Sequence, residues 1–398
     1  MKLRKLLAVV LASAMVFTTV ACGATETKET SSAVSTEVAA VEGETWKIGG
    51  IGPITGGAAI YGIAVQNGAQ IAVDEINAAG GINGYPIEFS FEDDEHNPEK
   101  SVNAYNALKD WGMELLLGTV TSGPCTAVSA EAAADNMYLL TPSASSTDVL
   151  ADKTNAFQVC FTDPNQGIGS AQFIGENAMA TKVAVIYDSS DVYSTGIYEK
   201  FAVEAENQPF EIVVAEAFTA DSNTDFSVQL QKAKAAGAEL VFLPIYYQQS
   251  ALILTQANDM GYAPTFFSCD GMDGILGVDN FDTSLAEGVV LLTPFVADAT
   301  DDLTVNFVTK YQEAYGETPI QFAADAYDGV YIIKAAIEKA GLTADASASD
   351  ICDALKAAMV EIAVDGLTGE GMTWAATGEV AKAPKAMVIK DGVYVTYN

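Results

Sequence analysis

The stretch IAVDEINAAGGINGYPIEFSFEDD, from Ile71 to Asp94, joins a helical segment to a β-rich run through a glycine-rich turn. Gly80 and Gly81 predict the end of the helix, because glycine adopts left-handed backbone angles without the steric cost that other residues carry. Gly84 predicts a tight turn before the next strand. A helix followed at once by a strand is the building unit of an α/β fold.

The same alternation runs along the chain from Trp46 onward. A first series of strands is predicted at 46–54, 87–94, 114–120 and 137–142, with helices at 60–80, at 98–111 and before the last strand. A second series begins near Asp163, with strands at 182–188, 211–218, 239–245, 265–271 and 288–295 and helices at 194–207, 224–238, 248–261, 303–316 and 322–341. Strands separated by helices predict parallel sheets with helices on both faces. The predicted fold class is α/β, with two Rossmann-like lobes.

The first residues, MKLRKLLAVVLASAMVFTTVACG, predict an export signal, because a basic start precedes an apolar run too short for a stable membrane span. Ala21 followed by Cys22 resembles the lipobox of bacterial lipoproteins, although Thr19 stands where leucine is usual. We expect cleavage of residues 1–21 and lipid attachment at Cys22; a plain signal peptide cut elsewhere is the alternative. Residues 22–44 are small, polar and acidic, which predicts a flexible tether.

The balance of charges restricts the partners. The chain of 398 residues holds 53 Asp and Glu against 19 Lys and Arg, a formal net charge of −34 at pH 7. Nucleic acids and anionic lipid surfaces require a basic face, so neither is expected as a partner. Arg4 is the only arginine and His96 is the only histidine.

The cysteines give no sign of a metal site, because none of them has C-x-x-C spacing and only one histidine is available. Isolated buried thiols are the preferred interpretation, and one disulfide is left open. The cysteines that follow the cleavage site are Cys125, Cys160, Cys269 and Cys352.

Catalytic motifs are missing from the sequence. A Walker A loop needs lysine and then serine or threonine after its second glycine, but Gly123 is followed by Pro124 and Cys125. No G-x-S-x-G elbow is present. Any nucleophile–base pair that uses histidine must use His96, which lies in the acidic loop EDDEHNPE. A carboxylate pair of the glycosidase kind is left open without a positive sign. We therefore predict a protein that is not an enzyme, with no cofactor, metal or catalytic residue.

The loop GTVTSGPCT, Gly118 to Thr126, lies between a predicted strand and a predicted helix. The start of a helix presents unpaired N–H groups at its positive end, and these groups bind an anion without a cationic side chain. Thr121 and Ser122 add hydroxyl donors, so the loop is a candidate nest for a carboxylate. The alternative is that Ser122 only N-caps the helix, with Pro124 near its first position.

Six further strings point to a family: IGGIGPITGGAAIYG, DEINAAGGINGYPIEFSFEDD, GTVTSG, LLTPSASS, VIYDSSDVYSTG and YYQQSALILTQANDMG. With them the chain from Trp46 to Asn398 resembles the extracellular substrate-binding proteins of ABC transporters for branched-chain amino acids, the Leu/Ile/Val-binding type. The resemblance implies the type I periplasmic-binding fold, in which a hinge of crossover strands joins two lobes. The implied lobes are 45–163 plus 296–366, and 164–295 plus 367–398.

The resemblance also implies a ligand site between the lobes. In that family the ligand's α-carboxylate sits on a serine and backbone amides at a helix start, and Ser122 matches this serine. Ser143 would offer its backbone carbonyl to the ligand's ammonium, and Ser145 its hydroxyl and N–H. Asp270 matches an acid from the other lobe, often a glutamate, that pairs with the ammonium. The positions of the aromatic residues around the ligand's side chain match Tyr61, Tyr193, Tyr246 and Phe322.

Some relatives also carry a disulfide between the loop after the EDD string and the loop before the serine. His96 and Thr121 occupy those positions here, so this bridge is absent.

These observations lead to one functional prediction. A lipid anchor at Cys22 would hold the protein on the outer face of the cytoplasmic membrane of a bacterium, where it would bind leucine, isoleucine or valine and deliver it to an ABC permease. A buried zwitterion needs both charges compensated, which the paired anchors would provide by hinge closure. The alternatives are the same fold binding short amides, urea or aromatic acids, a sensor-type ligand-binding domain, and a secreted hydrolase that depends on His96.

Overall fold

The computed structural model describes residues 43–397, and these belong to one compact unit. The predicted export signal, the lipid-attachment residue Cys22 and nearly all of the predicted tether lie outside the described residues. A search of the described helices finds none with the length and apolar character needed to cross a membrane.

The first sheet has five strands in the order β2-β1-β3-β4-β5, and every neighbouring pair is parallel. The strands are β1 (Trp46–Gly52), β2 (Ile87–Asp93), β3 (Leu115–Gly118), β4 (Leu139–Thr141) and β5 (Ala156–Gln158). The central strand β3 is buried along its whole length, as its run of leucines requires for a strand covered on both faces.

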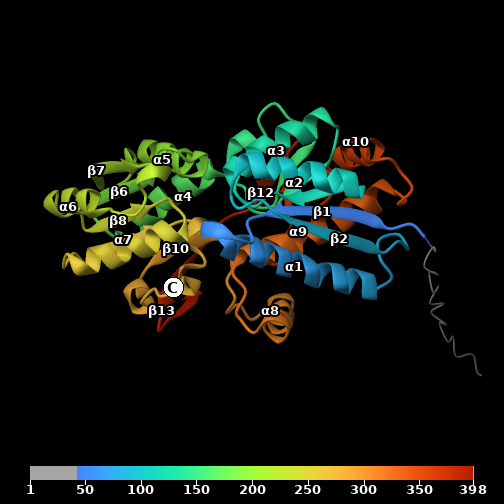
Figure 1. Ribbon diagram of the computed structural model, residues 1–398. Coiled ribbons are helices and arrows are strands. Elements are labelled where there is room, and N and C mark those ends of the chain that lie inside the picture. Colours follow the sequence, from blue (N-terminus) through green and yellow to red (C-terminus); the bar gives the residue numbers. More distant parts are fainter. Residues whose placement is uncertain (1–42, 398) are drawn as a thin grey trace, which may run out of the picture. The chain divides into compact units, whose positions relative to one another are not determined.

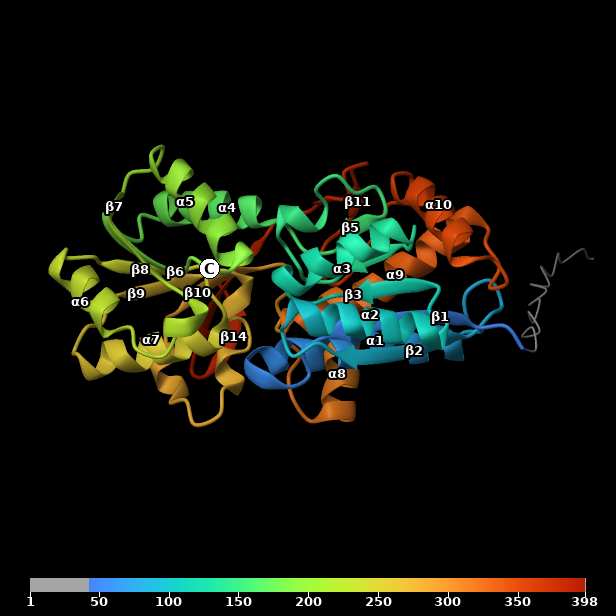
Figure 2. The same ribbon diagram turned by 45° about the horizontal axis from the view of Figure 1, so that its top comes forward.

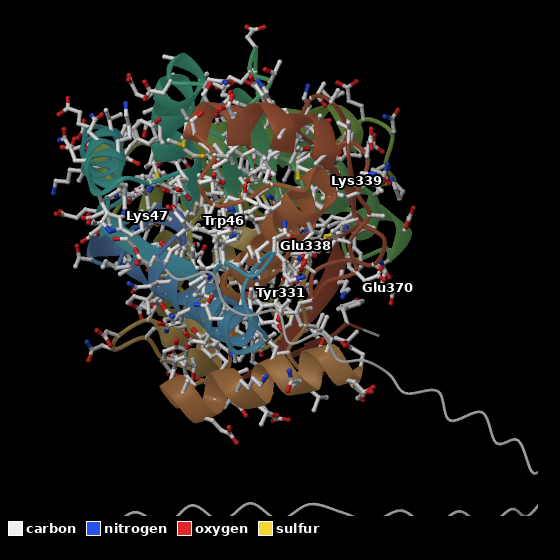
Figure 3. The ribbon with its side chains drawn as sticks, turned by 90° about the vertical axis from the view of Figure 1, so that its right-hand side faces the viewer. Trp46, Lys47, Tyr331, Glu338, Lys339 and Glu370 are labelled. Atoms are coloured by element: carbon white, nitrogen blue, oxygen red, sulfur yellow. The ribbon has the colours of Figure 1, made fainter. Side chains whose placement is uncertain are left out.

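The glycine-rich turn after α1 (Ala59–Ala78) has the backbone that the sequence predicts. Gly80 and Gly81 have φ angles of 103° and 78°, and a Cβ on Gly81 would lie 2.1 Å from the carbonyl oxygen of Tyr85. The turn is fixed to β1 by Trp46, which is fully buried and donates a hydrogen bond from Nε1 to the carbonyl of Ile82 at 3.1 Å. Figure 3 shows Trp46 within the side chains of this part of the protein.

Helices from two distant parts of the chain cover the first sheet. The early ones are α1, α2 (Pro98–Trp111) and α3 (Ser122–Ala134); the late ones are α8 (Asp302–Tyr315), α9 (Gln321–Ala340) and α10 (Ala348–Met359). α9 packs against α1, β3 and β4, and α10 packs against α9 and β3. In Figures 1 and 2 the orange helices accordingly lie with the blue and cyan elements.

The second sheet has seven strands in the order β14-β13-β10-β9-β8-β6-β7. The strands are β6 (Lys182–Asp188), β7 (Glu211–Phe218), β8 (Leu240–Leu243), β9 (Thr265–Ser268), β10 (Val290–Thr293), β13 (Lys385–Lys390) and β14 (Val393–Thr396). β6 to β10 form a parallel series, whereas β13 runs antiparallel to both β10 and β14. β13 and β14 can be antiparallel because a tight turn joins them, without the crossover that parallel neighbours need.

Helices cover both faces of the second sheet as well. They are α4 (Asp163–Glu176), α5 (Val192–Ala205), α6 (Ser227–Ala235) and α7 (Tyr247–Asp259). α4 and α5 share one buried cluster with the sheet, and α6 and α7 contribute to another. Figure 2 shows the two helix pairs on opposite faces. Short 3-10 helices complete the elements: η1 (Gly56–Ala58), η2 (Thr147–Val149), η3 (Ala220–Ser222), η4 (Asp270–Met272), η5 (Ile275–Gly277) and η6 (Thr283–Ala286).

The chain passes from one sheet to the other in the segments 159–162, 294–301 and 382–384, which form the hinge. Before the last passage, a small hairpin of β11 (Thr373–Trp374) and β12 (Val380–Ala381) contacts the first sheet, because the Trp374 indole donates to the carbonyl of Gln158 at 2.9 Å.

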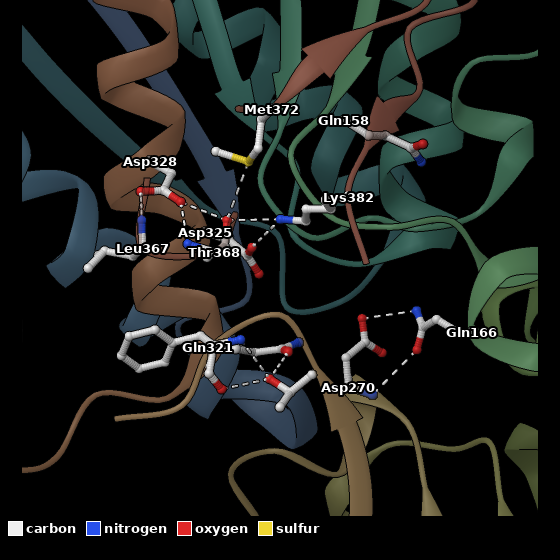
Figure 4. A network of polar contacts seen from close by, with 12 residues as sticks. Gln158, Gln166, Asp270, Gln321, Asp325, Asp328, Leu367, Thr368, Met372 and Lys382 are labelled. Carbon is white, nitrogen blue, oxygen red and sulfur yellow. Dashed lines mark hydrogen bonds and ion pairs between the residues drawn. The ribbon is translucent and has the colours of Figure 1, made fainter. Parts of the chain in front are cut away.

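A buried polar network holds the chain just before this hairpin. The Asp328 carboxylate on α9 accepts hydrogen bonds from the backbone N–H groups of Leu367 and Thr368, each at 2.8 Å. Lys382 Nζ donates to the Thr368 hydroxyl at 2.9 Å and lies 3.5 Å from the Asp325 carboxylate (Figure 4). These contacts favour placing 367–381 with the first lobe, whereas the resemblance implied the second lobe for this segment. The other predicted lobe boundaries stay predictions.

Candidate functional site

The predicted site residues follow the carboxyl ends of parallel strands, where α/β sheets place their ligands. Ser122 comes after β3, and Ser143 and Ser145 come after β4, in the first lobe. Tyr246 comes after β8 and Asp270 after β9, in the second lobe. The two sheets therefore direct these loops toward the same region from opposite sides.

All the predicted residues except Ser145 line one small cavity. The predicted members are Tyr61, Ser122, Ser143, Tyr193, Tyr246, Asp270 and Phe322, and the cavity wall also includes Val120, Thr121 and Gly271. All of the predicted members except Tyr246, which is half-buried, are at most 5% exposed. The cavity is thus enclosed by both lobes.

One end of the cavity is the amino terminus of α3. The helix begins at Ser122, and its N-cap is Thr121, whose side chain makes no capping hydrogen bond. The alternative that Ser122 serves as the N-cap is therefore wrong. The Ser122 hydroxyl instead accepts a hydrogen bond from the backbone N–H of Ser146 at 3.2 Å. The N–H groups of Ser122 and Gly123 belong to the first turn, which has no carbonyl partners within the helix, so this end suits an anion.

The loop after β4 lies beside this helix end. Ser143 donates from its hydroxyl to the carbonyl of Val120 at 2.8 Å, which joins the two loops. Ser145 is buried, and its carbonyl accepts from the backbone N–H of Asp163 at 3.0 Å. Its hydroxyl makes no hydrogen bond that meets distance and angle criteria among the described residues, and it acts on the carboxyl group of Asp163 rather than lining the cavity.

The opposite end of the cavity carries the carboxylate of Asp270. Tyr193 donates from its hydroxyl to Oδ1 at 2.7 Å, and Gln166 donates from Nε2 to Oδ2 at 3.0 Å. Burial raises the pKa of Asp270 to about 6, while the hydrogen bonds from Tyr193 and Gln166 act in the opposite direction. The carboxyl group is therefore mainly ionised at neutral pH.

This buried anion has no cationic partner within residues 43–397, where no lysine or histidine nitrogen lies within 4.0 Å of its oxygens. An ionised carboxylate out of water is costly unless it is paired, so the site favours a ligand that brings a positive charge to this end.

Aromatic rings form the walls between the two ends. Tyr61 stacks on Phe322 with ring centroids 4.2 Å apart, and Tyr193 stacks on Tyr246 at 4.8 Å. Tyr61 also meets Tyr246 edge-on at 5.7 Å. These rings give the middle of the cavity an apolar surface that suits an aliphatic or aromatic side chain.

His96 and Thr121, at the positions of the disulfide that some relatives carry, are close to each other. His96 Nδ1 lies 2.9 Å from Thr121 Oγ1, and the imidazole meets the Tyr246 ring edge-on at 5.5 Å. Burial lowers the pKa of His96, so the ring is neutral at pH 7 and adds no charge beside α3.

The cysteines within residues 43–397 are buried free thiols, as the preferred interpretation predicted: Cys125, Cys160, Cys269 and Cys352. A search of residues 43–397 finds no cluster of three His, Cys, Asp or Glu side chains that could hold a metal ion.

Two residues of the site region escaped the sequence prediction. Asp163 and Gln166 lie in the first turn of α4, a helix that was not predicted. Both are buried, and burial raises the pKa of Asp163 well above its usual range. Pro164 directly after Asp163 was the available signal, because proline is favoured in the first turn of a helix.

With the geometry described, the chain can be compared with known proteins. The family model described as "periplasmic binding protein" matches residues 45–392. The chain belongs to the periplasmic binding protein family. The two-lobed parallel α/β architecture of the family is the one that the sequence predicted.

Proteins named for binding branched-chain amino acids are similar to this chain over most of its length. This periplasmic binding protein is 31% identical over 306 residues to Leu/Ile/Val-binding protein homolog 3 of Brucella melitensis, covering 76% of this chain and 81% of the relative. It is 29% identical over 321 residues to the leucine-, isoleucine-, valine-, threonine-, and alanine-binding protein of Pseudomonas aeruginosa, covering 79% of this chain and 83% of the relative.

Among solved structures, the substrate-binding protein LivJ of Streptococcus pneumoniae, in complex with isoleucine, matches this periplasmic binding protein with a TM-score of 0.80 and 29% identity. The match covers 88% of this chain and 98% of LivJ. The leucine-binding protein LivK of Thermotoga maritima matches with a TM-score of 0.79 and 26% identity, covering 88% of this chain and 97% of LivK.

Proposed function

We propose that this protein binds an aliphatic amino acid between its lobes and delivers it to an ABC permease, without catalysing a reaction on it. The observation that carries the proposal is the cavity with opposite chemical ends. Uncharged donors at Ser122 and the start of α3 lie on one wall, and the unpaired carboxylate of Asp270 lies on another. An α-amino acid carries both a carboxylate for the first group and an ammonium for the second.

The ligand's side chain would lie among the aromatic rings. The wall that Tyr61, Tyr246 and Phe322 contribute offers no charged group, so an apolar side chain such as that of leucine, isoleucine or valine fits better than an acidic one. The names of the relatives support this choice, since they are described as binding leucine, isoleucine and valine.

The proposed subcellular location rests on residues 1–44, nearly all of which lie outside the described residues. The lipobox-like sequence ending at Cys22 would attach the protein to the outer face of the cytoplasmic membrane, and the acidic tether would allow it to reach the permease. Mass spectrometry of the full-length protein after export in a bacterial host tests this step, because a Cys22→Ala variant should lose the lipid mass and leave the membrane fraction.

Calorimetric titration with a panel of amino acids tests the proposed ligand class. We expect leucine, isoleucine and valine to bind, and glutamate and aspartate not to bind. Short amides, urea and benzoate in the same panel test the alternative ligands. Absence of heat and of thermal stabilisation with every amino acid would refute the proposal, and native mass spectrometry of the purified protein would then identify the ligand it carries.

A further inference from the structure

The first turn of α4 contacts the carboxylate that would receive the ligand's ammonium. Gln166 is fully buried, and its amide meets Asp270 twice. Nε2 donates to Oδ2 of Asp270 at 3.0 Å, and Oε1 accepts from the backbone N–H of Asp270 at 3.4 Å. Figure 4 draws both contacts between Gln166, on α4, and Asp270, at the start of η4.

We propose that Gln166 is a positioning residue for Asp270, and that it makes the cavity selective for ligands that carry a cationic nitrogen over carboxylic acids that lack one. This inference rests on the proposed function.

The geometry leaves little freedom to the carboxylate. Tyr193 holds Oδ1 at 2.7 Å while Gln166 holds Oδ2 at 3.0 Å, so the plane of the carboxyl group is fixed from two sides. Tyr193 is itself oriented, since its hydroxyl accepts from the N–H of Gly271 at 2.9 Å. An aspartate has a short side chain with few rotamers, and two donors of this kind fix both its position and its direction.

An uncharged amide at this position leaves the negative charge of Asp270 for the ligand. A glutamine side chain donates a hydrogen bond to the ionised carboxylate without adding a positive charge, which would take the place of the ligand's ammonium. Asp270 is thereby kept ionised but electrically unpaired. A ligand with an ammonium completes the pair, whereas a plain carboxylic acid leaves a buried charge uncompensated.

The ionisable groups around Asp270 do not supply a counter-charge. Asp163 on α4, Asp273 after η4 and Asp325 on α9 act on it through the interior. Burial raises the pKa of Asp273 to about 7 and that of Asp325 to about 8.

The phenols of the site are neutral, because burial raises the pKa of each well above its usual range; they are Tyr61, Tyr193 and Tyr246. The thiols of Cys160 and Cys269 are neutral for the same reason.

The test compares Gln166→Met, which keeps the volume but removes the donor, with wild type. Kd values for leucine and for 4-methylpentanoate, its analogue without the ammonium, are measured by calorimetry between pH 5 and pH 8. We expect leucine to bind about ten- to hundredfold more weakly, as for the loss of a hydrogen bond to a charged group. The Kd for 4-methylpentanoate divided by the Kd for leucine should fall, because the variant discriminates less between the two ligands. The pH below which leucine affinity declines should move upward.

The matched control is Gln172→Met. Gln172 lies on the same helix, is exposed, and donates a hydrogen bond to the Glu204 carboxylate at 3.3 Å. This variant should reproduce the wild-type Kd ratio and pH profile. If Gln166 only fills space, the variant Gln166→Met should lower affinity for both ligands equally and leave the pH profile in place, and that result would overturn the inference.

A second variant, Gln166→Glu, keeps the shape of the side chain in case the methionine variant does not fold. Two carboxyl groups at this distance share one proton near neutral pH, so leucine binding should release about one proton, as measured by titration in buffers of different ionisation enthalpy. Proton release equal to that of wild type would contradict the contact. Wild type that binds no amino acid would refute the proposed function, whereas normal wild-type binding with unaltered selectivity in the variants would refute this inference alone.

Discussion

The two ends of the cavity suit opposite charges of a ligand, and different parts of the protein form them. At the α3 end, Ser122 and backbone N–H groups offer partial positive charge without a cationic side chain. At the other end, Asp270 is a full negative charge that is 2% exposed and held by Tyr193 and Gln166. The first end tolerates an absent ligand, because uncharged donors are inexpensive to leave in contact with water. The second end does not, since a buried charge is costly until it is paired.

This difference indicates where ligand discrimination resides. The backbone nest accepts any carboxylate, so it selects weakly among amino acids and organic acids. The carboxylate of Asp270 stabilises a bound ligand that carries a positive charge, and it remains an unpaired buried charge when the ligand has none. It therefore discriminates strongly between ligands with and without an ammonium. Removing a group from each end should therefore have effects of different size.

Asp270→Asn should have the largest effect. The substitution preserves the shape of the side chain but leaves the ligand's ammonium without its counter-charge, and we expect leucine affinity to fall by about 3–5 kcal/mol, at least a hundredfold. Calorimetry measures the change. Asp279→Asn, at an exposed position, is the matched control and should bind as wild type does. Equal affinities in the two variants would refute the ammonium role of Asp270.

The pH dependence of binding isolates the same end. A proton on Asp270 competes with the ligand's ammonium, and the pKa of about 6 predicts that leucine affinity falls roughly tenfold per pH unit below about pH 6. Burial also raises the pKa of Asp94 and of Asp191 to about 6, but neither residue lines the cavity, so Asp270→Asn should lose most of this dependence. A wild-type affinity that stays constant from pH 8 to pH 4.5 would contradict the prediction.

The stability of the ligand-free protein should change in the opposite direction. The folded pKa of Asp270 is raised above the usual value of about 3.9, so the folded state binds the proton more tightly than the unfolded state. The corresponding stability is present below about pH 4 and is lost as the pH rises through about 6. Thermal unfolding should therefore show a lower Tm at pH 7 than at pH 5, with a smaller difference in Asp270→Asn.

Ser122→Ala tests the nest and should have a smaller effect. It removes one hydroxyl donor but leaves the backbone N–H groups in place, so leucine affinity should fall by about 1–2 kcal/mol, roughly five- to thirtyfold. Ser129→Ala provides a control on the same helix, since Ser129 is buried and bonds only to the carbonyl of Thr126. A loss as large as that of Asp270→Asn would show that both ends discriminate equally.

Tyr61→Phe should have the smallest effect, because Tyr61 joins the lobes without carrying charge. Its hydroxyl donates to the carbonyl of Gly271 and accepts from the N–H of Tyr247 at 3.2 Å, and both partners lie in the second lobe. Loss of these contacts should weaken closure and leucine binding by about 1 kcal/mol, roughly fivefold. Tyr262→Phe, whose hydroxyl bonds within the second lobe to Ala238, should alter stability but not affinity.

Local sequence signals were sufficient for most of the architecture. The glycines after α1 and the apolar run of β3 act on their own neighbours, so α1 and β3 could be predicted from the residues alone. α4 was missed even though Pro164 marks its first turn, because its glycine-containing sequence has a weak intrinsic helix propensity and tertiary packing stabilises it. Its absence from the prediction also hid Gln166.

The sequence by itself determined the order of most helices and strands, the acidic character of the chain and the uncharged donors around Ser122, because these depend on residue type and near neighbours. The tertiary structure alone decided that β13 runs antiparallel to β10 and that the segment before Lys382 contacts α9. It alone placed Gln166 against Asp270. Residues far apart in the sequence meet only when the folded chain buries them together, and no local pattern encodes which buried donor will satisfy which buried carboxylate.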